Sequence, residues 1–185
     1  TRNKTPLIFD TGNISPMRLG GNIFNRHPEI KPDGLLIHKG ISQGVPFGAV
    51  AVNDKLIPDE PPENNVGASS IALRAVLNFL NEYNLSGMKE SVSSNSAYLK
   101  KVLKELSETH ISLVDYRQIG FMFCLEFDFS AYELAREALK EGLILKPLNE
   151  KSVILTPYYY FGKSYCDELG FKLDKLLDKL AGYDR

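Results

Sequence analysis

The feature that most constrains this chain is an apolar run that ends in a lysine, followed by a glycine-rich turn and a second apolar run. The first run is 34–38, Lys39 follows it, and the second run leaves from Gly48. A lysine at the end of a strand is held by a rigid element and can be kept partly out of water. Desolvation favours the neutral amine, which is the form that attacks a carbonyl. Lys39 is therefore a candidate for covalent catalysis, although a solvated surface lysine before a turn has the same spacing.

A carboxylate occupies a similar position earlier in the chain. Residues 7–9 form a short apolar run that ends at Asp10, and 11–22 is rich in Gly, Asn, Ser and Pro. The run is typical of a buried parallel strand, and the stretch after it is typical of a loop. In open α/β sheets, ligands bind at the carboxyl ends of strands, so Asp10 is a candidate ligand-binding residue. An Asp that begins a turn is the alternative.

Helical and strand patterns alternate along the rest of the chain. Apolar residues at helical spacing predict helices at 69–83, 88–108, 130–141 and 163–180. Short apolar runs predict strands at 34–38, 47–52, 111–114, 121–127, 143–148 and 153–155. Ser130 and Glu133 predict a capping box, and Gly142 predicts the end of that helix. The proline-rich stretch 54–65 is predicted to be irregular.

Composition argues against several classes of protein. The 185 residues have a net charge of −1, with no basic excess that would indicate nucleic-acid binding and no charged tail. No apolar run approaches the roughly 20 residues that span a bilayer, and the first residues do not resemble a signal peptide. Cys124, expected in a strand core, and Cys166 cannot form a disulfide framework, and the histidines lack metal-ligand spacing. These features predict a cytoplasmic protein without a metal site.

The segment PDGLLIHKGISQGVPFGAV resembles the cofactor-lysine segment of the class III pyridoxal-phosphate-dependent aminotransferases. That family has a Pro-Asp pair, a strand, Lys-Gly, a glycine-rich turn and then Pro-x-Gly-Ala. The matching residues are Pro32, Asp33, Lys39, Gly40, Gly44, Pro46, Gly48 and Ala49. Upstream, LIFD resembles the family strand that ends in Asp, and Arg18 and Gly20 match the Arg-x-Gly that follows it. The resemblance runs from about residue 7 to the C-terminus and weakens after residue 85.

The resemblance implies pyridoxal 5'-phosphate as cofactor, bound covalently to Lys39. Lys39 would then act as general base and acid between the substrate carbon and the cofactor. Asp10 would pair with the pyridine nitrogen and keep it protonated, so that the ring can accept electrons from the substrate. Amino donors and keto acceptors would be the small-molecule partners.

Two expected cofactor contacts depart from the family pattern. The family usually continues Asp-Glu-x-Gln, with the Gln on the phenolic oxygen of the cofactor, whereas here the shorter Asn13 takes that place. Where the family carries a Thr that binds the cofactor phosphate, 62–67 contains no Thr. Ser69 or Ser70, at a predicted helix start, is the candidate replacement, because helix N-termini favour anions.

The C-terminal part resembles the small domain of the family, with two candidate substrate-binding residues. Arg117 begins a segment similar to the Arg-x-x-Gly between two small-domain strands, and a structural ion pair is the alternative role for it. The pair LKPL and VILTPYYYF is most similar to the biotin-pathway branch, the diaminopelargonate (adenosylmethionine-8-amino-7-oxononanoate) transaminases. In that branch an Arg anchors the substrate carboxylate. Lys146 occupies its position, with the charge but without the bidentate fork, and a surface lysine is the alternative.

These patterns predict an α/β fold, namely the C-terminal part of a fold-type-I pyridoxal-phosphate-dependent transferase. A partial large-domain sheet would occupy 1–85 and a small α+β domain 86–185. The implied function is amino-group transfer as part of a complete aminotransferase, and the alternative is a non-catalytic or degenerate interaction subunit. The phosphate loop and the aromatic residue that stacks on the cofactor would precede Thr1, and the strand edge at 7–9 would be open. A homodimer or a missing N-terminal half is therefore the expected partner.

Overall fold

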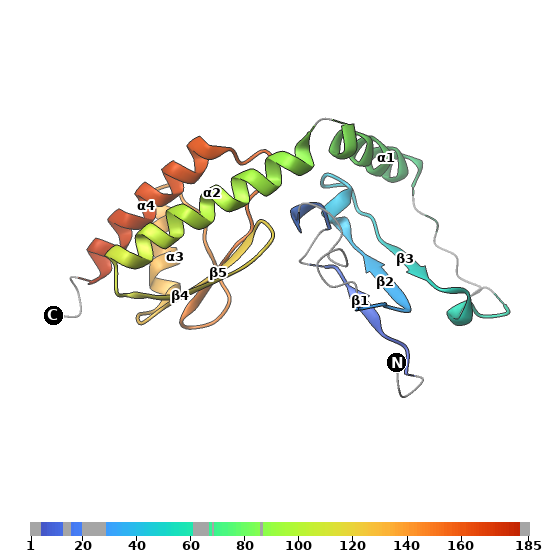
Figure 1. The fold of residues 1–185 in the computed structure, drawn as a ribbon, viewed down its shortest axis with the longest axis horizontal. Coiled ribbons are helices and arrows are strands. Elements are labelled where there is room, and N and C mark those ends of the chain that lie inside the picture. Colours follow the sequence, from blue (N-terminus) through green and yellow to red (C-terminus); the bar gives the residue numbers. More distant parts are fainter. Residues whose placement is uncertain are drawn as a thin grey trace. The chain divides into compact units, whose positions relative to one another are not determined.

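The computed structural model describes residues 5–12, 16–19, 29–60, 67, 69–85 and 87–181. The chain divides into two compact units, Thr1–Lys89 and Glu90–Arg185, each described by itself below (Figure 1). The sequence places the domain boundary after residue 85, whereas this division falls between Lys89 and Glu90, in the first turn of a helix.

The first unit is built on a three-stranded sheet with the order β1-β2-β3. The strands are β1 (Ile8–Asp10), β2 (Gly34–Ile37) and β3 (Ala49–Val52). β1 runs parallel to β2 with Asp10 opposite Leu36, and β3 runs antiparallel to β2 with Ala49 opposite Ile37. Helix α1 (Ser70–Leu85) lies against the 3₁₀ turn Lys39–Ile41, which follows β2. Two more 3₁₀ turns are at Pro16–Leu19 and Asp54–Leu56, so the stretches predicted as irregular there contain single helical turns.

Asp33, the acidic residue of the Pro-Asp pair, ties the three strands together. Its carboxylate accepts a hydrogen bond from the Leu7 backbone N–H at 2.9 Å and another from the Asn53 side-chain amide at 2.9 Å. Its backbone N–H donates to the Leu7 carbonyl, and its carbonyl accepts from the Asn53 N–H. The bond from Leu7, followed by that from Asn53, lowers the pKa of the Asp33 carboxyl. Asp33 thus aligns the chain before β1 with the chain after β3.

β1 is predicted from the sequence as a buried parallel strand, and only the parallel pairing is confirmed. Leu7 and Ile8 are 38% and 55% exposed. The reason is the position of β1 at the edge of the sheet, where β2 is its one partner among the described residues. The apolar side chains of Leu7 and Ile8 are therefore exposed along this edge, and edges of this kind favour pairing with another chain.

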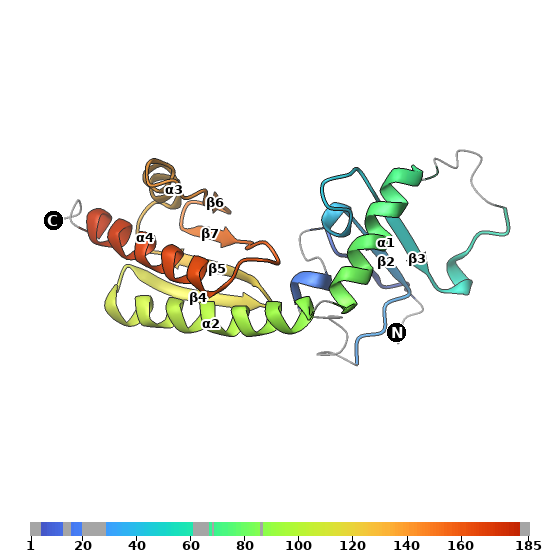
Figure 2. The same ribbon diagram turned by 90° about the horizontal axis from the view of Figure 1, so that it is seen from above.

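The second unit contains a four-stranded antiparallel sheet with the order β4-β5-β7-β6. The strands are β4 (Leu113–Ile119), β5 (Met122–Phe127), β6 (Lys146–Pro147) and β7 (Ser152–Leu155). The helices are α2 (Met88–Thr109), α3 (Ala131–Lys140) and α4 (Lys163–Ala181), and α4 lies between α2 and α3 (Figure 2). The fully buried side chains include Leu99, Leu103, Phe121, Phe123, Leu125, Phe127, Leu134, Leu173, Leu176 and Leu177.

A glycine allows α2 and α4 to pack closely. A Cβ built at Gly170 of α4 would lie 2.5 Å from Cγ1 of Val102 on α2. Nearby, the Tyr98 hydroxyl donates a 2.7 Å hydrogen bond to the Asp167 carboxylate, which links the same two helices. The predicted apolar stripes of both helices therefore meet in the core of this unit.

Three local predictions in the second unit are wrong in detail. β4 continues through Arg117–Ile119, which is predicted as a connection, because the antiparallel hairpin pairs those residues with β5 and the turn falls at Gly120. Residues 143–145 are not strand, since the Leu143 N–H closes the end of α3 on the Ala138 carbonyl. Ser130 makes no side-chain cap, and Glu133 instead pairs with Arg136.

The strand-core position expected for Cys124 is only partly confirmed. Cys124 does lie in β5, but its side chain is only half-buried, whereas Cys166 on α4 is fully buried. Burial, with a smaller contribution from Asp167, raises the pKa of the Cys166 thiol to about 11. Cys166 is therefore the cysteine that belongs to the core.

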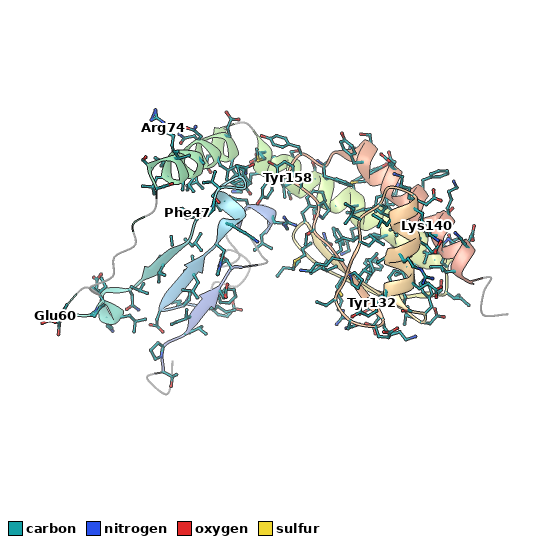
Figure 3. The ribbon with its side chains drawn as sticks, turned by 180° about the vertical axis from the view of Figure 1, so that it is seen from behind. Phe47, Glu60, Arg74, Tyr132, Lys140 and Tyr158 are labelled. Atoms are coloured by element: carbon teal, nitrogen blue, oxygen red, sulfur yellow. The ribbon has the colours of Figure 1, made fainter. Side chains whose placement is uncertain are left out.

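A buried carboxylate joins α3 to α4. The Glu137 side chain is 8% exposed and lies 2.6 Å from Lys140 Nζ on its own helix and 2.8 Å from Lys179 Nζ on α4. Lys140, the last residue of α3, is labelled in Figure 3. The hydrogen bond from Lys140, followed by that from Lys179, lowers the pKa of the Glu137 carboxyl to about 2.

We expect Glu137→Gln to destabilise the protein near neutral pH and to lose that effect in acid. The folded-state pKa lies below the ordinary value of 4.5, so the carboxylate contributes stability above 4.5 that disappears as the pH falls toward about 2. Urea midpoints across this range, compared between wild type and variant, measure the difference. Glu133→Gln, an exposed carboxylate on the same helix, is the control and should change little. A difference that stays constant with pH would show that the charge of Glu137 is not the cause.

Candidate functional site

The carboxyl ends of β1 and β2 bring the two principal candidate residues to one edge of the first sheet. β1 ends at Asp10, and Lys39 follows β2, which runs parallel to it. Thr11, which is 6% exposed, donates from both its N–H and its hydroxyl to the Leu36 carbonyl, at 3.0 and 2.8 Å. These bonds fix the chain immediately after Asp10 to β2. Asp10 and Lys39 therefore lie at the carboxyl edge of the sheet, as the sequence predicts.

A buried serine holds the turn that carries Lys39. Lys39 begins the 3₁₀ turn Lys39–Ile41, and the fully buried Ser42 hydroxyl lies 3.0 Å from the Lys39 carbonyl and 2.5 Å from the Val45 carbonyl. Gly44, at a φ of +92°, completes the turn in a conformation that favours glycine. The Lys39 side chain is exposed, so the described residues do not keep it partly out of water as its position suggested.

Asp10 has two close partners at one carboxylate oxygen. Its Oδ1 accepts a 2.7 Å hydrogen bond from the Gly12 N–H and lies 2.8 Å from Nε2 of His38. The Asp10 and His38 side chains are 62% and 45% exposed. The sequence predicts His38 as a packed or solvated residue, and its contact with Asp10 was not foreseen.

Strand register explains why His38 meets Asp10. Asp10 lies opposite Leu36, and His38 is two residues beyond Leu36, so side-chain alternation puts His38 on the same face as Asp10. Strand alternation alone predicts that His38 and Lys39 point to opposite faces. That holds only for a strand that continues, whereas β2 ends at Ile37 and Lys39 begins a helical turn. The register between β1 and β2 is the signal that could have found this contact.

Asn13 and Ser69 are the two other residues predicted to contact the cofactor. Asn13 lies outside the described residues. Ser69 precedes α1, and its hydroxyl oxygen accepts a 3.1 Å hydrogen bond from the Ala72 N–H, so it caps the helix. Among the described residues the hydroxyl proton has no acceptor, and the N–H groups of the first helical turn have no intrahelical acceptor. This terminus of α1 has the donors that an anion requires.

The candidate substrate residues lie in the second unit. Arg117 on β4 makes ion pairs with Glu126, at 2.9 Å, and with Asp115, at 3.5 Å, so its guanidinium already has two carboxylate partners. Lys146 on β6 is exposed and lines a pocket of about 240 Å³. The other lining residues are mainly apolar: Leu143, Ile144, Leu145, Ile154, Leu155, Thr156, Pro157, Phe161 and Leu169.

The donor set at the edge of the first sheet fits pyridoxal phosphate. A carboxylate suits a protonated ring nitrogen, and a lysine amine suits an aldehyde. Gly12 keeps the carboxylate accessible, because a Cβ there would approach Asp10 Oδ1 to 3.1 Å and the His38 ring to 3.7 Å. Within the described ranges, no three His, Cys, Asp or Glu side chains are grouped closely enough to hold a metal ion. The helices of the same ranges include none with the length and hydropathy of a membrane span.

The family model described as aminotransferase class-III matches residues 17–177. This chain belongs to the class III aminotransferases. Among its relatives, the acetylornithine aminotransferase of Caldanaerobacter subterraneus subsp. tengcongensis is 26% identical over 181 residues, covering 96% of this chain and 46% of that protein. The adenosylmethionine-8-amino-7-oxononanoate aminotransferase of Helicobacter pylori is 27% identical over 172 residues, covering 82% and 39%.

The fold of this class III aminotransferase chain is also found in solved structures. An ornithine aminotransferase from Plasmodium yoelii superposes with a TM-score of 0.82 at 22% identity, covering 96% of this chain and 49% of that one. The predicted family and fold class are therefore confirmed, and class III aminotransferases depend on pyridoxal phosphate. The chain spans less than half the length of both curated relatives.

Proposed function

We propose that this chain takes part in pyridoxal-phosphate-dependent transamination, as part of a complete aminotransferase. In the net reaction an amino group passes from an amine or amino acid to a keto compound, which becomes the new amine. The observation that carries the proposal is the position of Asp10 and Lys39 at the carboxyl ends of the parallel pair β1 and β2, within a chain of the class III family.

Each residue of the proposed site has a separate role toward the cofactor. Bound pyridoxal phosphate supplies a ring that accepts electrons from the substrate carbon. Asp10 would hold the ring nitrogen with its proton. Lys39 Nζ would hold the aldehyde carbon until the substrate amine takes its place, and the freed Nζ would then take the proton from the substrate carbon and return it, as a positioned general base and acid does. Ser69, with the first amides of α1, offers donors to the phosphate, and Asn13 is proposed for the phenolic oxygen.

The pocket beside Lys146 suits a substrate with a carboxylate and an aliphatic body. An ammonium group at the pocket rim provides a charge partner for the carboxylate, while the apolar lining accommodates methylene groups. Arg117 is a weaker candidate for the same role, because Glu126 and Asp115 already neutralise its charge. The similarity of this region to the biotin-pathway branch supports the assignment of Lys146.

We further propose that the first unit is part of the large domain and the second unit is the small domain. The partner would be a second copy or a separate N-terminal half, and the compartment would be the cytoplasm. Exposed apolar side chains support a partner: Ile71 and Leu77 on α1 are 73% and 60% exposed, and Leu7 and Ile8 at the edge strand β1 are exposed as well.

A non-catalytic interaction subunit is the second candidate. It is favoured by the lack of a Thr in 62–67, where the family binds the cofactor phosphate. A subunit of this kind would keep the surfaces that contact a partner but would not bind the cofactor, so cofactor binding separates the two candidates.

We expect the isolated 185-residue chain not to turn over an amino donor, and to self-associate or aggregate. Cofactor affinity depends on phosphate donors that are scarce in this sequence, and the exposed apolar edge favours association. Light scattering on the purified chain with added pyridoxal phosphate gives its mass, and half-transamination gives its activity. A soluble monomer that converts an amino donor would contradict this prediction.

A further inference from the structure

His38 contacts the carboxylate that would hold the cofactor ring. Its Nε2 lies 2.8 Å from Asp10 Oδ1, the same oxygen that accepts the Gly12 N–H at 2.7 Å. Among the residues that the structure describes, both contacts reach Oδ1, which leaves Oδ2 for another donor. We propose that His38 is a positioning residue that orients Asp10 so that Oδ2 accepts the ring N–H of the cofactor. This inference rests on the function proposed above.

The Asp10 carboxylate needs such support because its side chain is mostly exposed. At 62% exposure it has little packing to select one rotamer, and ordering a free side chain costs conformational entropy. Two donors from different segments restrict it: Gly12 follows β1, and His38 follows β2. Both segments are fixed by the pairing of β1 with β2 and by the bonds of Thr11 to the Leu36 carbonyl.

The chemistry of an imidazole suits this role. A neutral histidine with its proton on Nε2, or a charged one, donates to a carboxylate without competing for the ring nitrogen proton. Gly12 supports the same arrangement, because a Cβ there would press on both Asp10 Oδ1 and the His38 ring. Gly12 and His38 therefore both contact Oδ1 of Asp10, and Oδ2 is the oxygen that can accept the ring N–H.

Equilibrium binding of pyridoxamine 5'-phosphate to the assembled protein tests this role without relying on activity. This form of the cofactor has no aldehyde, so the covalent bond to Lys39 does not contribute. We expect His38→Ala to raise the dissociation constant about three- to tenfold, the range of one hydrogen bond. His38→Gln, whose amide N–H can take the place of Nε2, should restore most of the affinity. Arg74→Ala, an exposed change on α1 (Figure 3), is the control and should leave it unchanged.

Two comparisons separate positioning from a general structural effect. In an Asp10→Asn background, His38→Ala should have little further effect, because His38 acts through Asp10. The analogue of the ligand with carbon in place of the ring nitrogen should bind wild type and His38→Ala equally. Additive losses, or equal losses with both ligands, would overturn the inference, as would a normal affinity in His38→Ala. If wild type binds both ligands equally, Asp10 does not hold the ring nitrogen, and the proposed cofactor contact fails together with the role of His38.

Discussion

Replacing Lys39 by alanine is expected to lower kcat of the assembled protein by about 10²–10⁴-fold, which is what a positioned general base and acid contributes. The substitution removes both the covalent attachment of the cofactor and the group that moves the proton at the substrate carbon. Lys39→Arg should be as inactive, although it keeps the charge, because a guanidinium does not lose its proton in proteins. Steady-state kinetics with a saturating amino donor measure the effect.

Lys55→Ala is the matched control for the Lys39 variants. Lys55 is an exposed lysine of the same unit, in the 3₁₀ turn that follows β3. Its removal should leave kcat unchanged. Wild-type kcat in Lys39→Ala would show that the lysine of the catalytic step lies elsewhere, and the proposed site would then be wrong.

The second large effect is expected on substrate binding, when Lys146 is replaced. If Lys146 binds the substrate carboxylate, Lys146→Ala removes a charge-assisted contact of about 1.5–3 kcal/mol, which raises KM for that substrate by roughly ten- to a hundredfold. Lys146→Arg should keep the affinity or improve it, because the guanidinium can bind a carboxylate with two parallel hydrogen bonds.

The control for Lys146 is an exposed lysine on α2 of the same unit. Lys101 is 70% exposed and pairs only weakly with Glu105, at 3.6 Å, so Lys101→Ala should not change kcat/KM. An unchanged kcat/KM for the carboxylate-bearing substrate in Lys146→Ala would make Lys146 a surface residue without a substrate role.

The positions of Asp10 and Lys39 could be predicted because they depend on short-range signals. Each residue follows a short apolar run, and parallel strands bring their carboxyl ends to one edge of a sheet. The helices α1, α2 and α4 were also predictable, since their apolar residues repeat with helical spacing over sixteen residues or more.

The contact between His38 and Asp10 could not be predicted, because it requires the register of two strands separated by more than twenty residues. The exposure of β1 depends equally on which chain segments cover it, and the local sequence does not contain that information. The strand predicted at 111–114 is shorter than β4, which continues to Ile119, because the resemblance to the family's Arg-x-x-Gly predicts a connection that begins at Arg117. In the structure, its cross-strand ion pair with Glu126 stabilises those residues within the sheet.

Reduction of the cofactor-loaded protein with borohydride, followed by peptide mass mapping, tests the central claim most directly. Borohydride makes the bond between a lysine and the cofactor permanent, so that the modified peptide can be found. We expect the label on Lys39, the lysine that follows β2 at the same edge of the sheet as Asp10. A label on another lysine, or no label in a complete assembly, would contradict the assignment of this edge of the sheet as the cofactor site.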